Sequence, residues 1–229
     1  HSGQIIFDGV DAVSLRGKAL KAFRKRAPMI FQDPYGSLNP RLSVGGALEE
    51  VLQVHRLGRK ADRQEKTAEL FKSVGLDPAY LRRYPHEFSG GQRQRIGIAR
   101  ALSLQPSLIV ADEPVSALDV SVQVQILNLM KDLQRQYNLA YLFVAHDLAV
   151  VRYVCSRIMV MYLGRMVETG GADDLYWHPA HPYTEALLSA VPDVDKGLRT
   201  RAKKQKRIVL KGDVPSAAQT IPGCPFHPR

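Results

Sequence analysis

The stretch HEFSGGQRQRIGIARALSLQPSLIVADEPVSALD, residues 86–119, decides the fold of this chain. Its first part, Ser89-Gly90-Gly91-Gln92, opens an amphipathic run that continues to Leu104. Two adjacent glycines let a backbone approach a ligand closely, and the N–H groups and positive dipole end at a helix start suit an anion. The pattern therefore predicts a helix that begins at a phosphate-binding turn.

The second part of the stretch is a short apolar run, 108–111, that ends in Asp112 and Glu113. An apolar run of this length after Pro106 and Ser107 indicates a buried parallel strand whose carboxyl end opens into a site. One carboxylate at that end suits a magnesium ion, and the next suits an attacking water molecule. The two parts together predict phosphate chemistry.

With SALD at 116–119, these motifs resemble those of the nucleotide-binding subunit of ABC transporters. SGGQ is similar to the family signature, LIVADE to its Walker B strand and SALD to its D-loop. SGGQ alone would often be only a glycine-rich turn, but the three motifs in this order exclude that interpretation. The resemblance implies an α/β, P-loop NTPase-like (RecA-like) fold: a mostly parallel sheet flanked by helices, with an inserted helical subdomain.

Length and composition agree with one α/β domain, with or without a subdomain, because 229 residues can bury a sizeable core. No run approaches the roughly 18 to 20 apolar residues of a membrane span. The two cysteines, Cys155 and Cys224, do not make a disulfide framework, which predicts a reducing compartment.

The net charge of +10 is concentrated near the C-terminus, where the segment 196–211 holds eight basic residues and no acidic one. This segment is either a solvated linker or a contact with lipid headgroups or a partner. It contains no aromatic side chain that could stack on a base, so we expect no specific nucleic acid partner.

The resemblance also implies a motif that the sequence does not contain. SGQIIFDG, 2–9, is similar to the stretch that follows the phosphate-binding loop G-x-x-x-x-G-K-[ST] in ABC proteins, and that loop motif occurs nowhere in the 229 residues. Arg16-Gly17-Lys18 lacks the first glycine and the final Ser or Thr. We therefore expect the N-terminal part of the fold, with its Walker A loop, to be missing from this chain.

Two further motifs narrow the resemblance to the importers of oligopeptides, dipeptides and nickel. FQDPYGSLNPR, 31–41, and HPAHPYT, 178–184, are similar to stretches of that subfamily. Gln32 would be the Q-loop glutamine, which reaches the magnesium ion and the attacking water. His178 and His181 could bind a metal, but the prolines beside them favour a rigid turn. Cys224 by itself completes no metal-binding cluster.

The remaining pattern predicts helices at 44–55, 61–74, 121–136 and 183–190, the third of them capped by Ser121. Strands are predicted at 4–7, 28–32, 139–145, 156–162 and 165–169, and the strand 139–145 is expected to be buried. We expect an ABC ATPase domain at 1–192, its helical subdomain at about 39–95, and a basic C-terminal extension at 193–229.

The resemblance assigns a role to each candidate site residue. Glu113 would be the catalytic base, and His146, which follows the strand 139–145, would be the H-loop histidine that steadies the γ-phosphate. The metal, Mg²⁺, would be held by Asp112 and Gln32. The residues implied to bind ATP are Gln32, Ser89, Gly90, Gly91, Gln92 and Asp119.

The resemblance further implies partners and a location. Two nucleotide-binding subunits, identical or homologous, would sandwich ATP and drive transmembrane permease subunits, and an external solute-binding protein would act indirectly. The chain would lie peripherally on the cytoplasmic face of the cell (inner) membrane. The alternatives are a soluble ABC-type ATPase acting on nucleic acid and a non-catalytic docking fragment. No heptad array lies between Gln32 and Ser89, which argues against a chromosomal ATPase with a long coiled coil.

Overall fold

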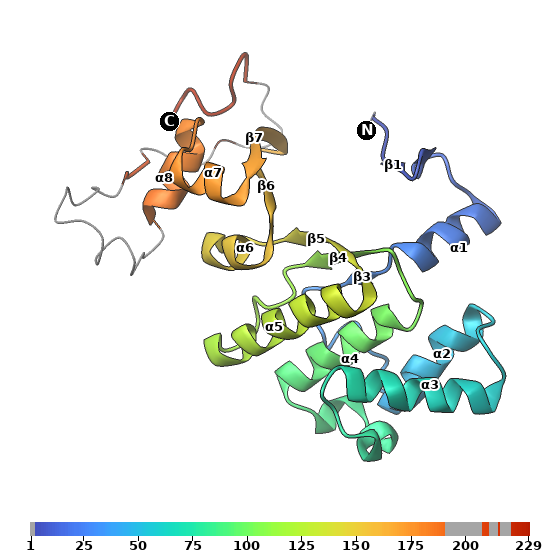
Figure 1. The fold of residues 1–229 in the computed structure, drawn as a ribbon. Helices are drawn as coiled ribbons and strands as arrows, with labels where there is room; N and C mark the ends of the chain where they lie inside the picture. The colour runs from blue at the N-terminus through green and yellow to red at the C-terminus, as the bar shows by residue number, and fades with distance from the viewer. Residues whose placement is uncertain (1–2, 191–207, 211–214, 216–220) are drawn as a thin grey trace. The chain divides into compact units, whose positions relative to one another are not determined.

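The structure is a computed structural model that describes residues 3–190, 208–210, 215 and 221–229 (Figure 1). Contacts divide the chain into two compact units, His1–Ala145 and His146–Arg229. The predicted domain boundary at 192/193 and most of the basic segment lie outside the described residues, so both stay predictions.

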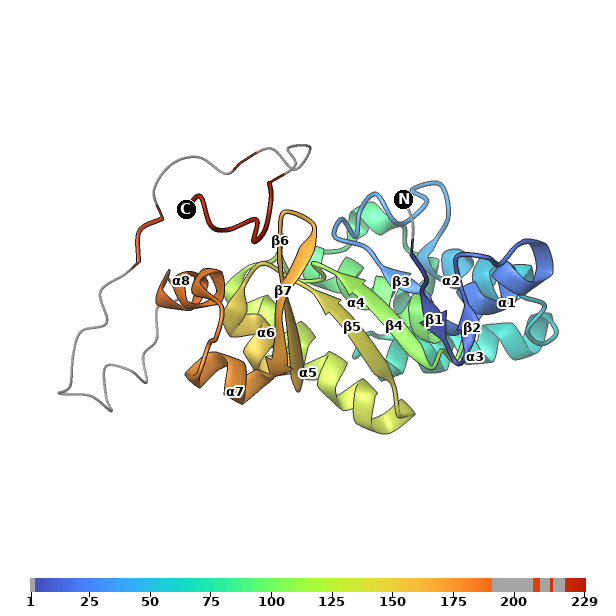
Figure 2. The same cartoon turned by 90° about the horizontal axis from the view of Figure 1, so that it is seen from above.

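The first unit is built on three parallel strands, β3 (Met29–Ile30), β4 (Leu108–Asp112) and β5 (Ala140–Val144). Figure 2 shows β4 between its two neighbours. Ile30 pairs with Ala111, and Asp112 pairs with Val144. Because the strands are parallel, their carboxyl ends meet at one edge of the sheet, where ligands bind in α/β folds. The predicted parallel sheet is confirmed.

Two helices accompany this sheet, α4 (Gly90–Leu102) and α5 (Val120–Tyr137). The predicted amphipathic run forms α4, and four of its apolar side chains are buried. The sheet contributes Ile30, Ile109 and Ala111 to the same core; from α4 come Ile96, Ile98, Ala99 and Leu102.

Gln94 is a polar residue of α4, yet its side chain is only 1 % exposed. The reason is that α4 packs on several sides, since it contacts α2 (Val44–Val54), α3 (Lys60–Ser73), α5 and β3. A helix surrounded in this way buries positions that a single apolar stripe does not include.

The strand β5 is less buried than predicted. Leu142 and Val144 are 42 % and 46 % exposed, and they alternate with half-buried neighbours. β5 lies at the edge of the sheet. Successive side chains of a strand point to opposite faces of the sheet, so Leu142 and Val144, two residues apart, lie on the same face.

A helical segment lies between β3 and α4, as the sequence predicted. It consists of α2, α3 and two short 3-10 helices, η1 (Pro78–Arg82) and η2 (Pro85–Glu87). Leu48 and Leu52 recur at helical spacing on α2 and are fully buried, as is Phe71 of α3. Gly75, with φ +72°, ends α3 in the left-handed conformation that glycine favours.

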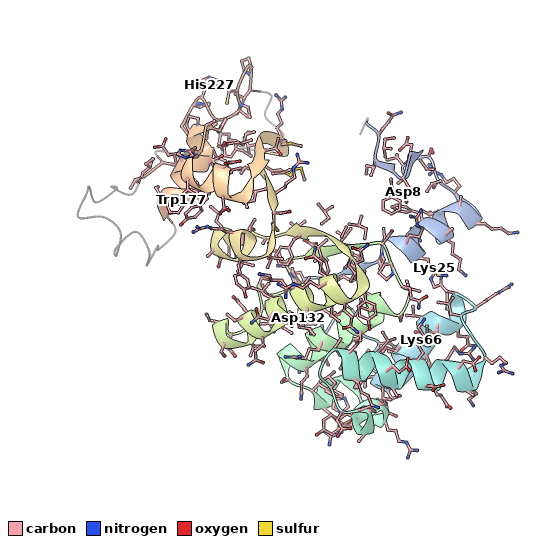
Figure 3. All side chains as sticks on the ribbon, viewed as in Figure 1. Asp8, Lys25, Lys66, Asp132, Trp177 and His227 are labelled. Carbon is pink, nitrogen blue, oxygen red and sulfur yellow. The ribbon has the colours of Figure 1, made fainter. Side chains whose placement is uncertain are left out.

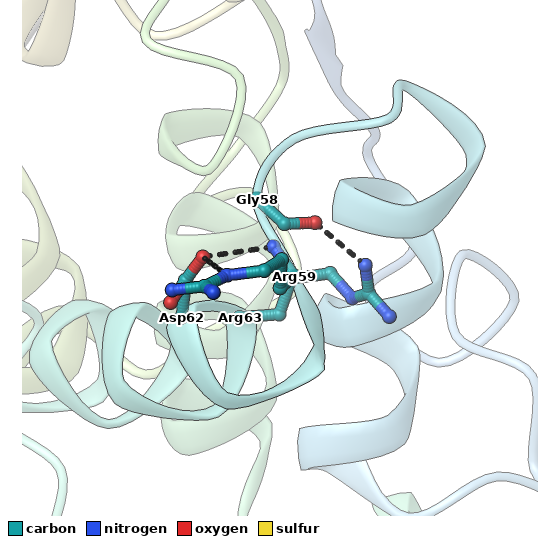
Figure 4. A network of polar contacts seen from close by, with 4 residues as sticks. All are labelled: Gly58, Arg59, Asp62 and Arg63. Atoms are coloured by element: carbon teal, nitrogen blue, oxygen red, sulfur yellow. Dashed lines mark hydrogen bonds and ion pairs between the residues drawn. The ribbon is translucent and has the colours of Figure 1, made fainter.

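Polar contacts fix the start of α3 (Figure 4). The Arg59 backbone N–H donates to Asp62 Oδ2 at 2.9 Å, and Arg63 Nη1 donates to the Gly58 carbonyl at 2.8 Å. The Asp62 carboxylate thus satisfies a helix-start donor that has no partner within the helix.

The N-terminal part of this unit is a hairpin of β1 (Ile6–Phe7) and β2 (Val10–Asp11), followed by α1 (Gly17–Arg26). Lys21 Nζ donates to the carbonyl of Val54 at 2.8 Å. A cation therefore lies at the C-terminal end of α2, where the helix dipole is negative.

The predicted cap of α5 was wrong by two residues. Asp119, rather than Ser121, precedes the first helical residue and has extended backbone angles, φ −62° and ψ 148°. Ser121 lies inside the first turn. At the other end Asn138, with φ 51°, ends the helix in the left-handed region.

The second unit contains a two-stranded hairpin, β6 (Arg157–Tyr162) and β7 (Arg165–Gly171), which confirms the predicted pair of strands. Leu163 and Gly164, both with positive φ, form its two-residue turn. The helices are α6 (Leu148–Val154), α7 (Ala172–Trp177) and the predicted α8 (Pro182–Ala190). We did not predict α6 and α7, which are too short for a clear periodic signal.

Side chains from α6 and α7 pack by cation–π contact. The Arg152 guanidinium lies 3.8 Å from the centre of the Tyr176 ring and 5.2 Å from that of Trp177, which Figure 3 labels. Contacts of this kind add to the stabilisation that burial of the rings provides.

The C-terminal segment 221–229, which includes His227 in Figure 3, packs against the same unit. Phe226 is buried, with its ring centre 5.4 Å from those of Tyr162 and Tyr183. Cys224 Sγ lies 3.6 Å from His181 Nε2. Within the described residues no group of three His, Cys, Asp or Glu side chains could hold a metal ion.

Glu168 of β7 holds the turn before α8, and we expect it to make this unit sensitive to acid. Its carboxylate accepts the backbone N–H groups of Ala180 at 2.8 Å and His181 at 3.1 Å. Burial raises the pKa of Glu168, but the nearby Thr184 hydroxyl, the hydrogen bonds from these two N–H groups and the charge of His181 lower it overall.

A carboxyl group whose pKa is lower in the folded state stabilises the fold above its unfolded pKa and loses that effect as the pH falls through the folded pKa. Glu168→Gln should therefore lower the free energy of unfolding by about 1 kcal/mol at pH 7. The difference from wild type should shrink as the pH falls below about 4, the ordinary range of a glutamate pKa. Denaturant titrations across pH measure this, with the exposed Glu65→Gln as control; a difference that grows in acid would contradict the prediction.

Candidate nucleotide site

The carboxyl edge of the sheet brings Gln32 and Glu113 together. Gln32 follows β3, Glu113 follows β4, and Gln32 Nε2 donates to Glu113 Oε2 at 2.9 Å. The two residues are far apart in sequence, and the parallel pairing of Ile30 with Ala111 places the strand ends side by side. The two side chains that were predicted to orient the attacking water therefore touch.

The backbone fixes the position of Glu113. Its φ of 42° lies in the left-handed region, which a non-glycine residue seldom adopts, and its N–H donates to the Val144 carbonyl at 2.9 Å. The bond to β5 holds the residue in this conformation, and such conformations are concentrated at functional sites. Sequence reasoning did not find Val144, because only its backbone takes part.

Asp112 is the last residue of β4 and is half-buried. Its carboxylate is a hard oxygen donor of the kind that magnesium prefers, and so is the amide oxygen of Gln32, whose nitrogen donates to Glu113. Magnesium is usually held by one or two carboxylates together with substrate phosphates, rather than by a full protein cage. The residues at this edge therefore fit a magnesium–nucleotide complex.

The signature forms the start of α4. Ser89 Oγ accepts the Gln92 N–H at 3.3 Å, and Gln92 Oε1 accepts the Ser89 N–H at 3.0 Å, so the two side chains make a reciprocal cap. Gly90 and Gly91 lie in the first helical turn, whose N–H groups have no acceptor within the helix. The predicted helix start is confirmed, and its role in binding an anion stays a prediction.

The two glycines of the signature meet α5 and the residues before it. A Cβ on Gly90 would lie 3.3 Å from Leu118 Cδ2, and one on Gly91 would lie 2.4 Å from Val122 Cγ1. Gly91 is therefore required by packing as well as by any ligand. Asp119, at the N-cap of α5, lies between these two neighbours in sequence, so the signature and the D-loop form one local group.

His146 begins the second unit and is followed by Asp147, whose carboxylate accepts the Ala149 N–H at 2.8 Å at the start of α6. The two units are described separately, so the predicted role of His146 at the γ-phosphate stays a prediction. The site residues thus fall into three places. Gln32, Asp112 and Glu113 lie at the sheet edge; Ser89, Gly90, Gly91, Gln92 and Asp119 lie at the signature; His146 lies at the start of the second unit.

Comparison with known proteins identifies the class. Residues 1–116 match the family model described as ABC transporter, and residues 167–229 match that described as oligopeptide/dipeptide transporter, C-terminal region. The chain belongs to the ABC transporter family, in which the ATP-binding subunits carry these motifs.

Curated relatives are similar over most of the chain. It is 54 % identical to the oligopeptide transport ATP-binding protein AppF of Bacillus subtilis over 228 residues, which is 99 % of this chain and 68 % of that protein. It is 52 % identical to a putative peptide import ATP-binding protein of Brucella ovis, covering 100 % and 70 %. With OppF of Streptococcus mutans, an oligopeptide transport ATP-binding protein, the identity is 57 % over 84 % and 63 % of the two chains.

Solved structures agree with the fold. The ATP-binding cassette MJ0796, in a dimeric post-hydrolysis state bound to ADP and Pi, superposes with a TM-score of 0.64 at 28 % identity, covering 75 % of this chain and 74 % of its own. CbiO1 of Clostridium perfringens, part of the ABC transporter complex cbiONQ, superposes with a TM-score of 0.69 at 25 % identity, covering 77 % and 69 %. In the part of the chain that the structure describes, no helix has the length and apolar character needed to cross a membrane.

Proposed function

We propose that this chain is the ATP-binding and ATP-hydrolysing subunit that powers import of peptides, or of similar small solutes, across the cytoplasmic membrane. The observation that carries the proposal is the Gln32–Glu113 contact at the carboxyl edge of the parallel sheet, directly beside Asp112. The similarity to peptide-import ATP-binding proteins over the whole chain supports the solute class.

The proposed chemistry depends on positioned charge, which supplies most of the catalysis in phosphoryl transfer. Glu113 polarises the attacking water and accepts its proton, and Gln32 orients the Glu113 carboxylate. Asp112 and Gln32 would hold Mg²⁺, which would supply positive charge opposite the phosphates of ATP. His146 steadies the γ-phosphate.

We propose that the signature side binds nucleotide held by a second ATP-binding subunit, identical or homologous. Ser89 and the first N–H groups of α4 contact its terminal phosphate, and Asp119 contributes from the adjoining D-loop. The dimeric state of the MJ0796 cassette with ADP and Pi supports an assembly of this kind.

The further partners that we propose are transmembrane permease subunits, with an external solute-binding protein acting indirectly, which locates the chain peripherally on the cytoplasmic face of the membrane. The membership of CbiO1 in an ABC transporter complex supports the association with permeases. The ATPase domain would comprise 1–192, with its helical subdomain at about 39–95, and 193–229 would be a basic extension.

The alternative of an ATPase acting on nucleic acid is not favoured, because the curated relatives described above are named for peptide import or transport. A non-catalytic docking fragment is disfavoured by the presence of Asp112, Glu113 and Gln32 at one sheet edge.

ATP-driven uptake of labelled oligopeptides tests the proposal. The transporter containing this sequence is placed in vesicles with the ATP-binding side exposed. Uptake of the peptides should require Mg-ATP. It should stop in the Asp112→Asn variant, which loses a carboxylate that suits Mg²⁺. Duplex DNA serves as the competing ligand. ATP-independent uptake, or hydrolysis stimulated by DNA with a steep salt dependence, would contradict the proposal.

A further inference from the structure

The motif FQDPYGSLNPR contains a compact turn, 33–38, that the proposed chemistry does not explain. Asp33 Oδ1 accepts the Tyr35 N–H at 2.8 Å, and the Asp33 carbonyl accepts the Ser37 N–H at 3.2 Å. The Leu38 N–H donates to the Tyr35 carbonyl at 3.3 Å. The turn therefore closes on itself immediately after Gln32.

Packing explains why two residues of the turn, Gly36 and Leu38, occupy their positions. A Cβ on Gly36 would lie 2.8 Å from Asp33 Oδ2, so this position has no room for a side chain while Asp33 makes its bond. Leu38 is 2 % exposed and anchors the end of the turn in the core. Tyr35, in contrast, is 50 % exposed, and its ring needs another explanation.

Two arginines of α4 hold this turn from one face of the helix. The Arg93 guanidinium lies over the Tyr35 ring, 5.1 Å from its centre, and Arg93 Nε donates to the Phe88 carbonyl at 2.9 Å. Two turns further along, Arg100 Nη1 donates to the carbonyl of Ser37. Residues seven apart lie on the same helix face, so both arginines point to the turn.

Arg100 is placed between the turn and a second helix. Burial lowers the pKa of its guanidinium, and Glu50 on α2 opposes that effect. A half-buried guanidinium is costly unless its donors are used, and hydrogen bonds to charged groups are the stronger ones. The Ser37 carbonyl and the Glu50 charge compensate this cost.

We propose that Arg93 and Arg100 are positioning residues that fasten the turn 33–38 to the helix of the signature, and so hold Gln32 against Glu113. Ser89 caps the same helix, so the helix that begins at the signature also holds the turn that follows Gln32. The roles of Gln32 and Glu113 in this inference rest on the proposed function. The contacts of Arg93 and Arg100 with the turn do not depend on it.

Hydrogen exchange of the turn amides is the first test. Arg100→Gln should speed exchange in the peptide 33–38 by roughly tenfold, because a charged hydrogen bond is lost. Arg100→Lys, which keeps one charged donor, should retain part of the protection. Arg95→Gln is the matched control on the same helix, because Arg95 donates to the Val74 carbonyl at 2.8 Å and not to the turn.

A second pair of variants covers the case in which Arg100→Gln does not fold. Tyr35 is half exposed, so its replacement leaves the core intact. Tyr35→Leu should speed exchange about two- to fivefold, whereas Tyr35→Phe, which keeps the ring face for Arg93, should leave it near wild type. Unchanged exchange in both Arg100→Gln and Tyr35→Leu, or an equal change in Arg95→Gln, would overturn the proposal.

The link to Glu113 is read from the NMR signal of the Gln32 side-chain amide. The Glu113→Gln variant gives the chemical shift of the Gln32 amide when the charged acceptor is lost. In Arg100→Gln and Tyr35→Leu the signal should move from its wild-type position toward that chemical shift. An unmoved signal would refute the positioning role. Neither measurement uses nucleotide. If the turn loosens as expected but the protein does not hydrolyse ATP, the proposed function is wrong and the positioning role of the arginines stands.

Discussion

Glu113→Gln is expected to lower Mg-ATP hydrolysis by the assembled transporter by about 10² to 10⁴-fold, the range that general base catalysis contributes. The amide cannot accept the proton of the attacking water. It still offers an oxygen to Gln32 Nε2, which now lies 2.9 Å from the carboxylate, so the local structure should persist. Nucleotide affinity should therefore stay close to that of the wild type.

Steady-state hydrolysis and equilibrium binding of Mg-ATP together decide this prediction. Glu65→Gln, on the exposed side of α3, makes the same chemical change away from the sheet edge and should leave both quantities unchanged. Retained turnover in Glu113→Gln would remove the residue from the proposed chemistry. A loss of binding equal to the loss of turnover would instead assign it to nucleotide affinity.

Gly91→Ala is expected to destabilise the first unit by about 1–3 kcal/mol, the range for overpacked sites. The new Cβ would lie 2.4 Å from Val122 Cγ1, closer than such atoms can approach, so the Val122 side chain or the two helices must shift. Gly97 on the same helix is the matched control, because a Cβ added there would have no neighbouring atom within 4 Å. Gly97→Ala should stabilise by about 0.5–1 kcal/mol through helix propensity.

Urea denaturation measures both effects, and a second substitution tests the cause. Val122→Ala removes the methyl group that the new Cβ would meet, so Gly91→Ala combined with Val122→Ala should cost less than the sum of the two single changes. If Gly91→Ala and Gly97→Ala change the free energy of unfolding by the same amount, the Val122 side chain moves aside at little cost. Gly91 is then not required by packing.

Much of the first unit follows from local sequence. The Ser89–Gln92 cap, the apolar run to Asp112 and the spacing of Leu48 and Leu52 each specify hydrogen bonding or burial within a few residues. Parallel pairing of two apolar strands then requires their polar ends to share one edge, which is why the meeting of Gln32 with Glu113 could be expected.

Other features depend on which surfaces meet. Gln94 is buried because α4 is surrounded, and Gly91 is required because Val122 of another helix lies against it. The contacts of Arg93 with Tyr35 and of Arg100 with Ser37 join segments more than fifty residues apart.

Local sequence patterns therefore specify the class of the protein, its nucleotide motifs and the elements that carry them, because periodicity, caps and turn residues act over short range. The bond from Arg100 of the signature helix to the turn after Gln32, and the bond from the Glu113 N–H to the Val144 carbonyl of β5, become visible only in the folded chain. Those contacts are fixed by packing between segments that are distant in sequence. A local pattern does not specify which distant side chain or carbonyl will lie beside it.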